Sequence, residues 1–252
     1  MRLALRKRPG GPLSLKPVGD QAVLAELGTE ICEETSRRVM ELYAALEQMR
    51  KRQEPEAEGI LEMVPAYASL LVYYDPAKTD YGRAAAAVER AARRRSGSGE
   101  ARGRLLRIPV CYGGGFGEDL EEAAALARMT PEDLVRIHSG RDYRVYMLGF
   151  LPGFPYLGGM DSAIAVPRKQ TPRTRIPAGS VGIGGSQTGI YPSESPGGWQ
   201  LIGRTPLRLL KENGAGGWET LCRPGDTVRF CAVEAAEYEE ILRKGEDIWR
   251  LQ

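Results

Sequence analysis

Short apolar segments separated by glycines and prolines fill the second half of the chain, and they restrict its fold more than any other feature. Residues 149–206 combine more glycine, proline, arginine and aromatic residues than an ordinary surface loop of that length. Such spacing is typical of short strands joined by tight turns. We therefore expect a closed or nearly closed antiparallel barrel. Its predicted strands are residues 143–150, 164–166, 181–183, 199–202, 207–210 and 227–231.

The first hundred residues have a different pattern. Residues 16–27 read as one short strand, and apolar residues at three- and four-residue steps from Ile31 to Met49 predict an amphipathic helix. Two apolar clusters within residues 59–74 flank Pro65, which indicates two strands and a turn. An alanine-rich helix over residues 81–95 follows. The order strand, helix, strand, strand, helix is a ferredoxin-like pattern.

The expected organisation is α+β, a ferredoxin-like N-terminal domain followed by the barrel. The predicted parts are a basic tail over residues 1–15, the first domain over 16–95, a glycine-serine linker over 96–103 and the barrel domain over 104–252.

Three helices and one further strand are predicted within the barrel domain. Alternating apolar residues over 106–112 predict a strand, and residues 119–129 predict a helix. A second helix begins at Thr130, with Pro131 in its first turn, and carries His138 on its apolar side. The third runs from Ala235 to near Trp249, with its inward face formed by Tyr238, Ile241, Leu242 and Ile248.

Charge and hydropathy exclude several classes of protein. The formal net charge is +2, from 35 basic and 33 acidic residues, so a nucleic-acid partner is not expected. No apolar run approaches the roughly 18 residues of a membrane span, and the basic first residues lack the apolar stretch of a signal peptide. We expect a cytoplasmic protein.

The cysteines and the histidine do not suggest a metal site. The four cysteines are widely spaced, no Cys-x-x-Cys pair exists, and the chain has one histidine. A structural zinc site needs a denser set of ligands. We expect four reduced, partly buried thiols and no bound metal.

Four motifs in the glycine- and proline-rich segment identify a family. They are GFLPGFPYL at 149–157, PRTRIPAGSVG at 172–182, QTGIYP at 187–192 and SPGGWQLIGRT at 195–205; PVGD at 17–20 and PAYASLLV at 65–72 extend the likeness. With these motifs the chain resembles the B subunit of bacterial 5-oxoprolinase, a family also called allophanate hydrolase subunit 1 and sensor histidine kinase inhibitor (Kip type). The resemblance covers nearly the whole chain apart from the tail and the linker.

The resemblance implies a fold, an activity and partners. The fold is a ferredoxin-like domain joined to a cyclophilin-like β-barrel, similar to subdomains C and D of a carboxyltransferase domain. The activity is ATP-dependent hydrolysis of 5-oxo-L-proline to L-glutamate, together with a C subunit and an A subunit. ATP belongs to the complex, and the sequence does not locate its site in this chain. Two alternatives stay open: a non-enzymatic inhibitor of a sensor histidine kinase, and an allophanate- or urea-type amide-processing subunit.

A cationic segment contains most of the candidate site residues. Six basic residues against Glu194 alone lie between Pro167 and Arg208, and planar guanidinium groups suit carboxylate or phosphate ligands. The glycines of 179–189 leave backbone N–H groups accessible to an anion. The predicted catalytic residues, which we expect to line one pocket, are Arg173, Arg175, Gln187, Tyr191 and Arg204. The predicted substrate-binding residues are Thr188, Ser195, Trp199, His138 and Lys169.

Each of these residues also has a structural interpretation. Glycines and prolines are what barrel corners require, and exposed arginines are often only solvated. His138 on an apolar helix face is more often packed than catalytic. No G-x-S-x-G elbow, phosphate-binding loop or dinucleotide motif accompanies the candidates, so a complete ATP-coupled catalyst is not expected in this chain alone.

Overall fold

The computed structural model describes residues 12–94, 103–214 and 216–244, and it forms two compact units that divide just before Gly103. Most of the predicted tail (1–15) and linker (96–103) lies outside the described residues, as does the predicted end of the last helix. Within the described ranges, no helix is long and apolar enough to cross a membrane.

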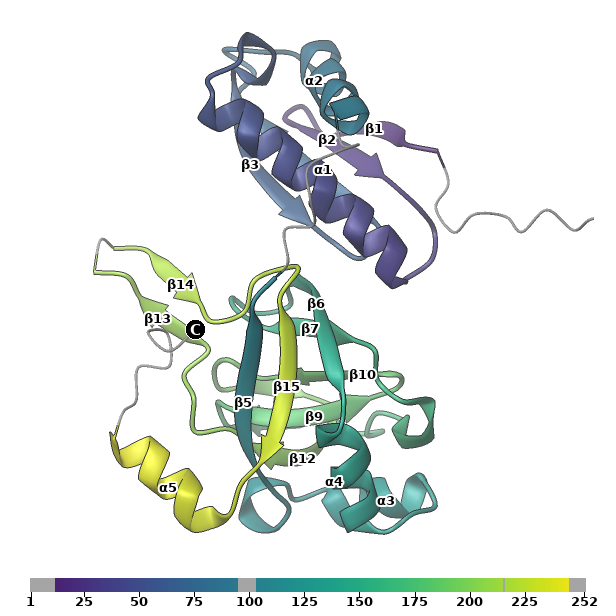
Figure 1. Cartoon of the computed structure of the whole chain (residues 1–252), viewed down its shortest axis with the longest axis vertical. Helices are drawn as coiled ribbons and strands as arrows, with labels where there is room; N and C mark the ends of the chain where they lie inside the picture. The colour runs from purple at the N-terminus through teal and green to yellow at the C-terminus, as the bar shows by residue number, and fades with distance from the viewer. Residues whose placement is uncertain (1–11, 95–102, 215, 245–252) are drawn as a thin grey trace, which may run out of the picture. The chain divides into compact units, whose positions relative to one another are not determined.

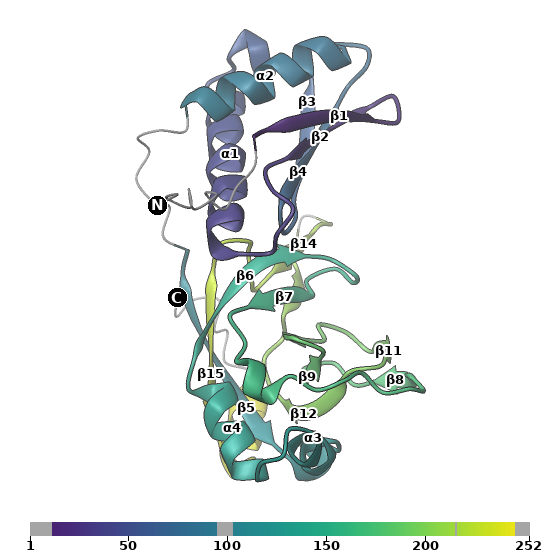
Figure 2. The ribbon, with the colours of Figure 1, turned by 90° about the vertical axis from the view of Figure 1, so that its right-hand side faces the viewer.

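The N-terminal unit is a four-stranded antiparallel sheet with two helices packed against one of its faces (Figure 1 and Figure 2). The strand order is β1-β2-β4-β3. Apolar residues of both helices and of the strands' inward positions form one core, which includes Leu42, Leu46, Leu70 and Val88. The elements are β1 (Ser14–Val18), β2 (Ala22–Glu26), α1 (Glu33–Lys51), a 3-10 turn (Pro55–Ala57), β3 (Ile60–Pro65), β4 (Ser69–Tyr74) and α2 (Tyr81–Arg94).

The single strand predicted over residues 16–27 is wrong, because the structure has a hairpin there. Val18 pairs with Ala22, and Gly19 turns the chain at a φ of 56°, which a glycine adopts without strain. The two helices and the strand pair around Pro65 are confirmed. The placement of Ile31 on the apolar face of the first helix is wrong, since Ile31 precedes α1 and is 60% exposed.

The C-terminal unit contains a closed barrel of seven strands, in the order β10-β7-β6-β15-β5-β12-β9, with β9 pairing β10 to close it. A buried apolar cluster from all sides of the barrel fills its interior. The barrel strands are β5 (Leu105–Tyr112), β6 (Asp142–Leu148), β7 (Pro155–Gly158), β9 (Ser180–Gly184), β10 (Gln187–Ile190), β12 (Gln200–Arg204) and β15 (Thr227–Ala232).

Smaller elements surround this barrel. Two two-stranded sheets stand outside it: β8 (Arg173–Ile176) with β11 (Ser195–Gly197), and β13 (Leu210–Glu212) with β14 (Trp218–Thr220). The helices are α3 (Leu120–Leu126), α4 (Pro131–Ser139) and α5 (Ala235–Lys244), with 3-10 turns at Gly114–Phe116 and Ser162–Ile164.

The prediction of a wholly antiparallel barrel is wrong at one pair of strands. β15 runs parallel to residues 105–110 of β5, and the two strands lie side by side in Figure 1. Two predicted strands are also absent from the described barrel. Ile164 is buried at the end of a 3-10 turn, and Val166 makes only an isolated bridge to Gly185. Residues 207–210 are mostly loop before β13.

The helices of this unit largely agree with the sequence. Thr130 Oγ1 accepts a hydrogen bond of 3.2 Å from the backbone N–H of Asp133, which confirms the predicted start of α4. On α5, Tyr238 is buried as expected, but Leu242 is 52% exposed, so its predicted inward position is wrong. Ile248 and Trp249 lie outside the described residues.

Candidate functional site

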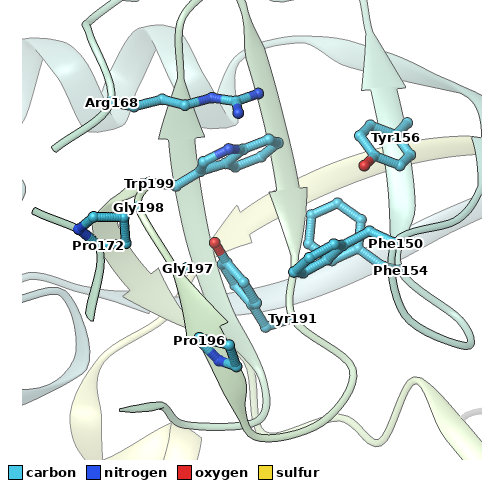
Figure 3. Close-up of a pocket in the computed structure, with 10 residues that line it drawn as sticks. All are labelled: Phe150, Phe154, Tyr156, Arg168, Pro172, Tyr191, Pro196, Gly197, Gly198 and Trp199. Atoms are coloured by element: carbon cyan, nitrogen blue, oxygen red, sulfur yellow. The ribbon is translucent and has the colours of Figure 1, made fainter. Parts of the chain in front are cut away.

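A cavity of about 300 Å³ opens in the C-terminal unit and is lined mainly by aromatic side chains (Figure 3). Its volume is at the low end of the range of roughly 300–1,000 Å³ that is usual for small-molecule sites. The walls come from the loop between β6 and β7 with the start of β7, the stretch that leads into β8, the residue after β10, and β11 with the residues that follow it. The lining residues are Phe150, Phe154, Tyr156, Arg168, Pro172, Tyr191, Pro196, Gly197, Gly198 and Trp199.

The aromatic wall is a set of edge-to-face contacts centred on Phe154. Its ring centroid lies 5.2 Å from Tyr156, 5.3 Å from Tyr191 and 5.6 Å from Trp199. Such pairs contribute about 0.5–1.5 kcal/mol each beyond the area they bury. The ring centroid of Phe150 lies 5.7 Å from that of Phe154, but the Phe150 side chain is 62% exposed. Its backbone φ of 65° is unusual for a residue other than glycine. The rings of the wall therefore pack on one another, and Phe150 is the exposed one among them.

Arg168 is the cation of the pocket. Its guanidinium lies 5.7 Å from the ring centroid of Trp199, and Figure 3 shows it stacked along the indole. Arg168 is exposed, and no ion pair joins it to a carboxylate in the part of the chain that the structure describes. A guanidinium held on an aromatic face keeps its hydrogen-bond donors available. This pocket therefore suits a small anion.

Tyr191 adds a neutral hydroxyl to the same cavity. Burial raises the pKa of Tyr191 to about 12, although a hydrogen bond from the Trp199 backbone opposes this rise. The phenol is therefore protonated at neutral pH. Because its oxygen accepts from the backbone, its own proton is free to be donated to a ligand.

Lys169 and Arg173 share a buried carboxylate that the sequence analysis missed. Asp119 Oδ1 accepts from Lys169 Nζ at 3.0 Å and from Arg173 Nη2 at 2.6 Å, while Oδ2 accepts from the backbone N–H of Leu201 at 2.7 Å. Lys169 also pairs with Glu122 at 2.8 Å. Burial raises the pKa of Asp119, but the hydrogen bonds from Arg173, Leu201 and Lys169 outweigh it and leave the pKa lowered. Both cations are thus neutralised within the chain.

The other predicted catalytic residues do not line the cavity. Arg175 is 77% exposed and pairs with Glu194 at 2.6 Å. Arg204 lies on β12 with its buried Nε lacking a hydrogen-bond partner among the described atoms, and Gln187 lies half-buried on β10. The prediction that the five residues line one pocket is wrong, since only Tyr191 does so. Of the predicted substrate-binding residues, Trp199 lines the cavity, whereas Ser195 is buried nearby and donates to the Pro196 carbonyl.

His138 and Thr188 belong to a chain of hydrogen bonds inside the barrel. Thr188 Oγ1 donates to the Gly182 carbonyl at 3.1 Å, so it must accept from His138 Nε2 at 2.9 Å. His138 Nδ1 then accepts from the Tyr112 hydroxyl at 2.8 Å. Burial lowers the pKa of His138 to about 3, which keeps the imidazole neutral. The hydrogen bonds described for both side chains are internal to the barrel, and neither residue lines the cavity.

The fold that carries this aromatic cavity is a closed β-barrel of seven strands joined to a separate α+β unit. The chain belongs to the family "Carboxyltransferase domain, subdomain C and D", whose match covers residues 13–217. It is 42% identical to the 5-oxoprolinase B subunit of Bacillus subtilis (strain 168), over 89% of this chain and 94% of that protein. It is 39% identical to the 5-oxoprolinase B subunit of Escherichia coli O157:H7, over 84% of this chain and 93% of that protein.

Solved structures agree with this assignment. The crystal structure of TTHA0988 in space group P212121 superposes with a TM-score of 0.72 and 38% identity, and 86% of this chain spans 41% of TTHA0988. PH0987 from Pyrococcus horikoshii is 44% identical over 89% of this chain and all of that one, with a TM-score of 0.51. The Kluyveromyces lactis urea amidolyase, at 20% identity and a TM-score of 0.70, shares the fold over 16% of its length.

Proposed function

We propose that this chain is the B subunit of an ATP-dependent 5-oxoprolinase, which hydrolyses 5-oxo-L-proline to L-glutamate together with a C subunit and an A subunit. The names of the relatives support the activity. The observation that carries the proposal is the stack of Arg168 on Trp199 at the wall of an aromatic cavity, with no carboxylate pairing Arg168 in the described parts of the chain.

The chemistry of 5-oxoproline matches the groups that line this cavity. The molecule has one free carboxylate, which the Arg168 guanidinium can bind through two parallel hydrogen bonds. Its small lactam ring has apolar faces that suit the rings of Phe154 and Trp199. The neutral hydroxyl of Tyr191 can donate to the lactam carbonyl oxygen. Each of the three parts of the substrate thus has a counterpart in the pocket.

Tyr191 would also assist the reaction. An amide is a poor electrophile, and negative charge develops on its carbonyl oxygen as it is attacked. A fixed donor in a water-poor site stabilises that charge more than it stabilises the resting carbonyl. A phenol with its pKa at about 12 stays protonated for this role across the neutral range.

The residues in and around this cavity do not fit ATP. Lys169 and Arg173 are neutralised by Asp119, and Arg175 is paired with Glu194, which leaves Arg168 as the one cation at the wall of the cavity. A triphosphate needs several donors and cations converging on one place. We therefore assign ATP binding to the partner subunits.

The partner subunits are inferred from the relatives, which are named B subunits of 5-oxoprolinase. This chain corresponds to 41% of TTHA0988 and to 16% of the urea amidolyase, so the same fold also occurs as one segment of longer polypeptides. We propose that separate C and A subunits supply the remaining parts here. Within this chain, the sheet order β1-β2-β4-β3 fits a ferredoxin-like unit whose edge strand comes from the N-terminal hairpin, and the barrel fits a cyclophilin-like unit.

The test is reconstitution. The purified chain, mixed with its C and A subunits, should form glutamate from 5-oxoproline only when ATP is present, and the chain alone should show no turnover. In the complex, Arg168→Ala should raise KM for 5-oxoproline by roughly 10- to 100-fold, the loss of one charge-assisted contact. Arg175→Ala is the matched control, because Arg175 lies outside the cavity. Equal effects of the two substitutions, or no glutamate from the complete complex, would refute the proposal.

A further inference from the structure

We propose that Asp119, which lies outside the pocket, is the positioning residue that holds Arg168 in place on Trp199. The proposal deepens the function proposed above and rests on it for the identity of the ligand. Its basis is the number of groups that this one buried carboxylate binds.

Asp119 joins two separate segments of the chain. Its side chain is 4% exposed and accepts hydrogen bonds from Arg173 Nη2 at 2.6 Å and from Lys169 Nζ at 3.0 Å. Its other oxygen accepts from the Leu201 N–H at 2.7 Å, and its own N–H donates to the Leu201 carbonyl at 2.9 Å. One residue thus anchors the segment 167–173 and the start of β12 together.

Further hydrogen bonds hold the same two segments to each other. The Lys169 N–H donates to the Gly198 carbonyl at 2.7 Å. The Gln200 amide donates to the Pro167 carbonyl and accepts from Lys169 Nζ, both at 3.4 Å. The Lys169 ammonium is shared among Asp119, Glu122 and Gln200, so the loss of the Asp119 charge would remove one of the two carboxylates that hold it beside Gln200.

The anchored residues are the direct neighbours of pocket residues. Arg168 precedes Lys169, and Pro172 precedes Arg173 in the first segment. Gly198 and Trp199 lie just before Leu201 in the second. Arg168 and Trp199 therefore sit on the two segments that Asp119 ties together, and their stacking at 5.7 Å depends on that tie.

A second buried carboxylate in the same unit provides a matched control. Asp226 is 5% exposed and accepts from the Arg104 side chain at 2.6 Å, from the Arg104 N–H at 3.0 Å and from the Arg223 N–H at 2.9 Å. Its burial and its partners are like those of Asp119, but neither Arg104 nor Arg223 lies in a segment that lines the cavity. Any general cost of losing a buried carboxylate should appear in both variants.

The kinetic test compares Asp119→Asn with Asp226→Asn in the reconstituted complex. Both should lower the melting temperature of the chain. Asp119→Asn alone should raise KM for 5-oxoproline, by about tenfold if the Arg168 contact is largely lost, and should change kcat much less. Equal KM values in the two variants would overturn the proposal. A wild-type complex that forms no glutamate would instead refute the proposed function. The role of Asp119 would then still be tested by Trp199 fluorescence, which needs no ligand.

The second measurement needs no ligand. With Trp218→Phe and Trp249→Phe in place, the remaining emission comes from Trp199, since the chain has three tryptophans. Asp119→Asn should increase acrylamide quenching of this emission, because Arg168 no longer covers the indole, and Asp226→Asn should leave it unchanged. If Asp119→Asn fails to fold, Lys169→Gln removes one partner and should shift quenching in the same direction. Unchanged quenching in the folded variant would overturn the proposal.

Discussion

Gly197 packs directly against the hydroxyl of Tyr191. A Cβ atom at position 197 would lie 2.5 Å from Tyr191 Oη and 2.7 Å from Ile176 Cδ1, closer than such atoms can approach. A Cβ atom at Gly198 would lie 3.5 Å from its nearest neighbour, a side-chain atom of Pro172, which is an ordinary contact. Gly197 at the end of β11 and Gly198 directly after it thus differ in how much space a side chain would find.

Gly197→Ala should therefore displace the Tyr191 ring and weaken 5-oxoproline binding. The expected cost of such overpacking is about 1–3 kcal/mol of folding free energy. KM in the complex and the melting temperature of the chain measure the two effects. Gly198→Ala is the control for stability and should leave the melting temperature nearly unchanged, because its Cβ atom would make only ordinary contacts. A Gly197→Ala variant with unchanged KM would show that the ligand does not depend on the position of Tyr191.

His138 should make the stability of the chain depend on pH. Its pKa is about 3 in the folded protein against the ordinary histidine value of 6.5, so the unfolded chain binds the proton more tightly. The contribution of His138 to the free energy of unfolding should therefore be complete above about pH 6.5. It should decrease as the pH falls below that value, by at most roughly 1.4 kcal/mol per pH unit.

The measurement is urea unfolding between about pH 5 and 7, where most carboxylates are already ionised. The chain has one histidine, so no other imidazole contributes. His138→Gln should be less stable at pH 7, because it disrupts the bonds to Tyr112 and Thr188, but it should lose most of the pH dependence in this range. A slope unchanged by His138→Gln would mean that another group titrates.

Local features of the fold were predictable, and long-range pairing was not. The Thr130 cap and the strands around Pro65 follow from residues close in sequence, and the structure has them where expected. The parallel pairing of β5 with β15 joins Leu105 to Thr227, and no local pattern states such a partner. Hydrophobic periodicity predicts that a segment is a strand, but which strands pair with it depends on residues far away in the sequence.

The same distinction applies to the pocket. Tyr191 and Trp199 belong to the sequence motifs, and both line the cavity. The excess of cations that singled out Arg173 is cancelled by Asp119, which lies 54 residues earlier in the chain. Arg168 belongs to the same cationic segment, but sequence alone could not show that it is the arginine that lines the cavity. A count of charges along a sequence does not include the carboxylates that folding brings close.

Phe150 has a strained backbone and also lines the cavity, so its substitutions should affect the stability of the chain and the binding of substrate in different ways. Its φ of 65° is costly for an aromatic residue, by about 1–3 kcal/mol, while a glycine adopts it freely. Phe150→Gly should therefore keep or raise the melting temperature, since relief of strain offsets the greater entropy of the unfolded glycine chain. The same substitution removes a ring from the pocket and should raise KM for 5-oxoproline several-fold. Phe150→Leu keeps the strain and loses the ring, so it should raise KM without the gain in stability. A Phe150→Gly variant with wild-type KM would show that this ring does not contact the ligand. A lower melting temperature of the same variant would show that the ring stabilises the loop by more than the backbone strain destabilises it.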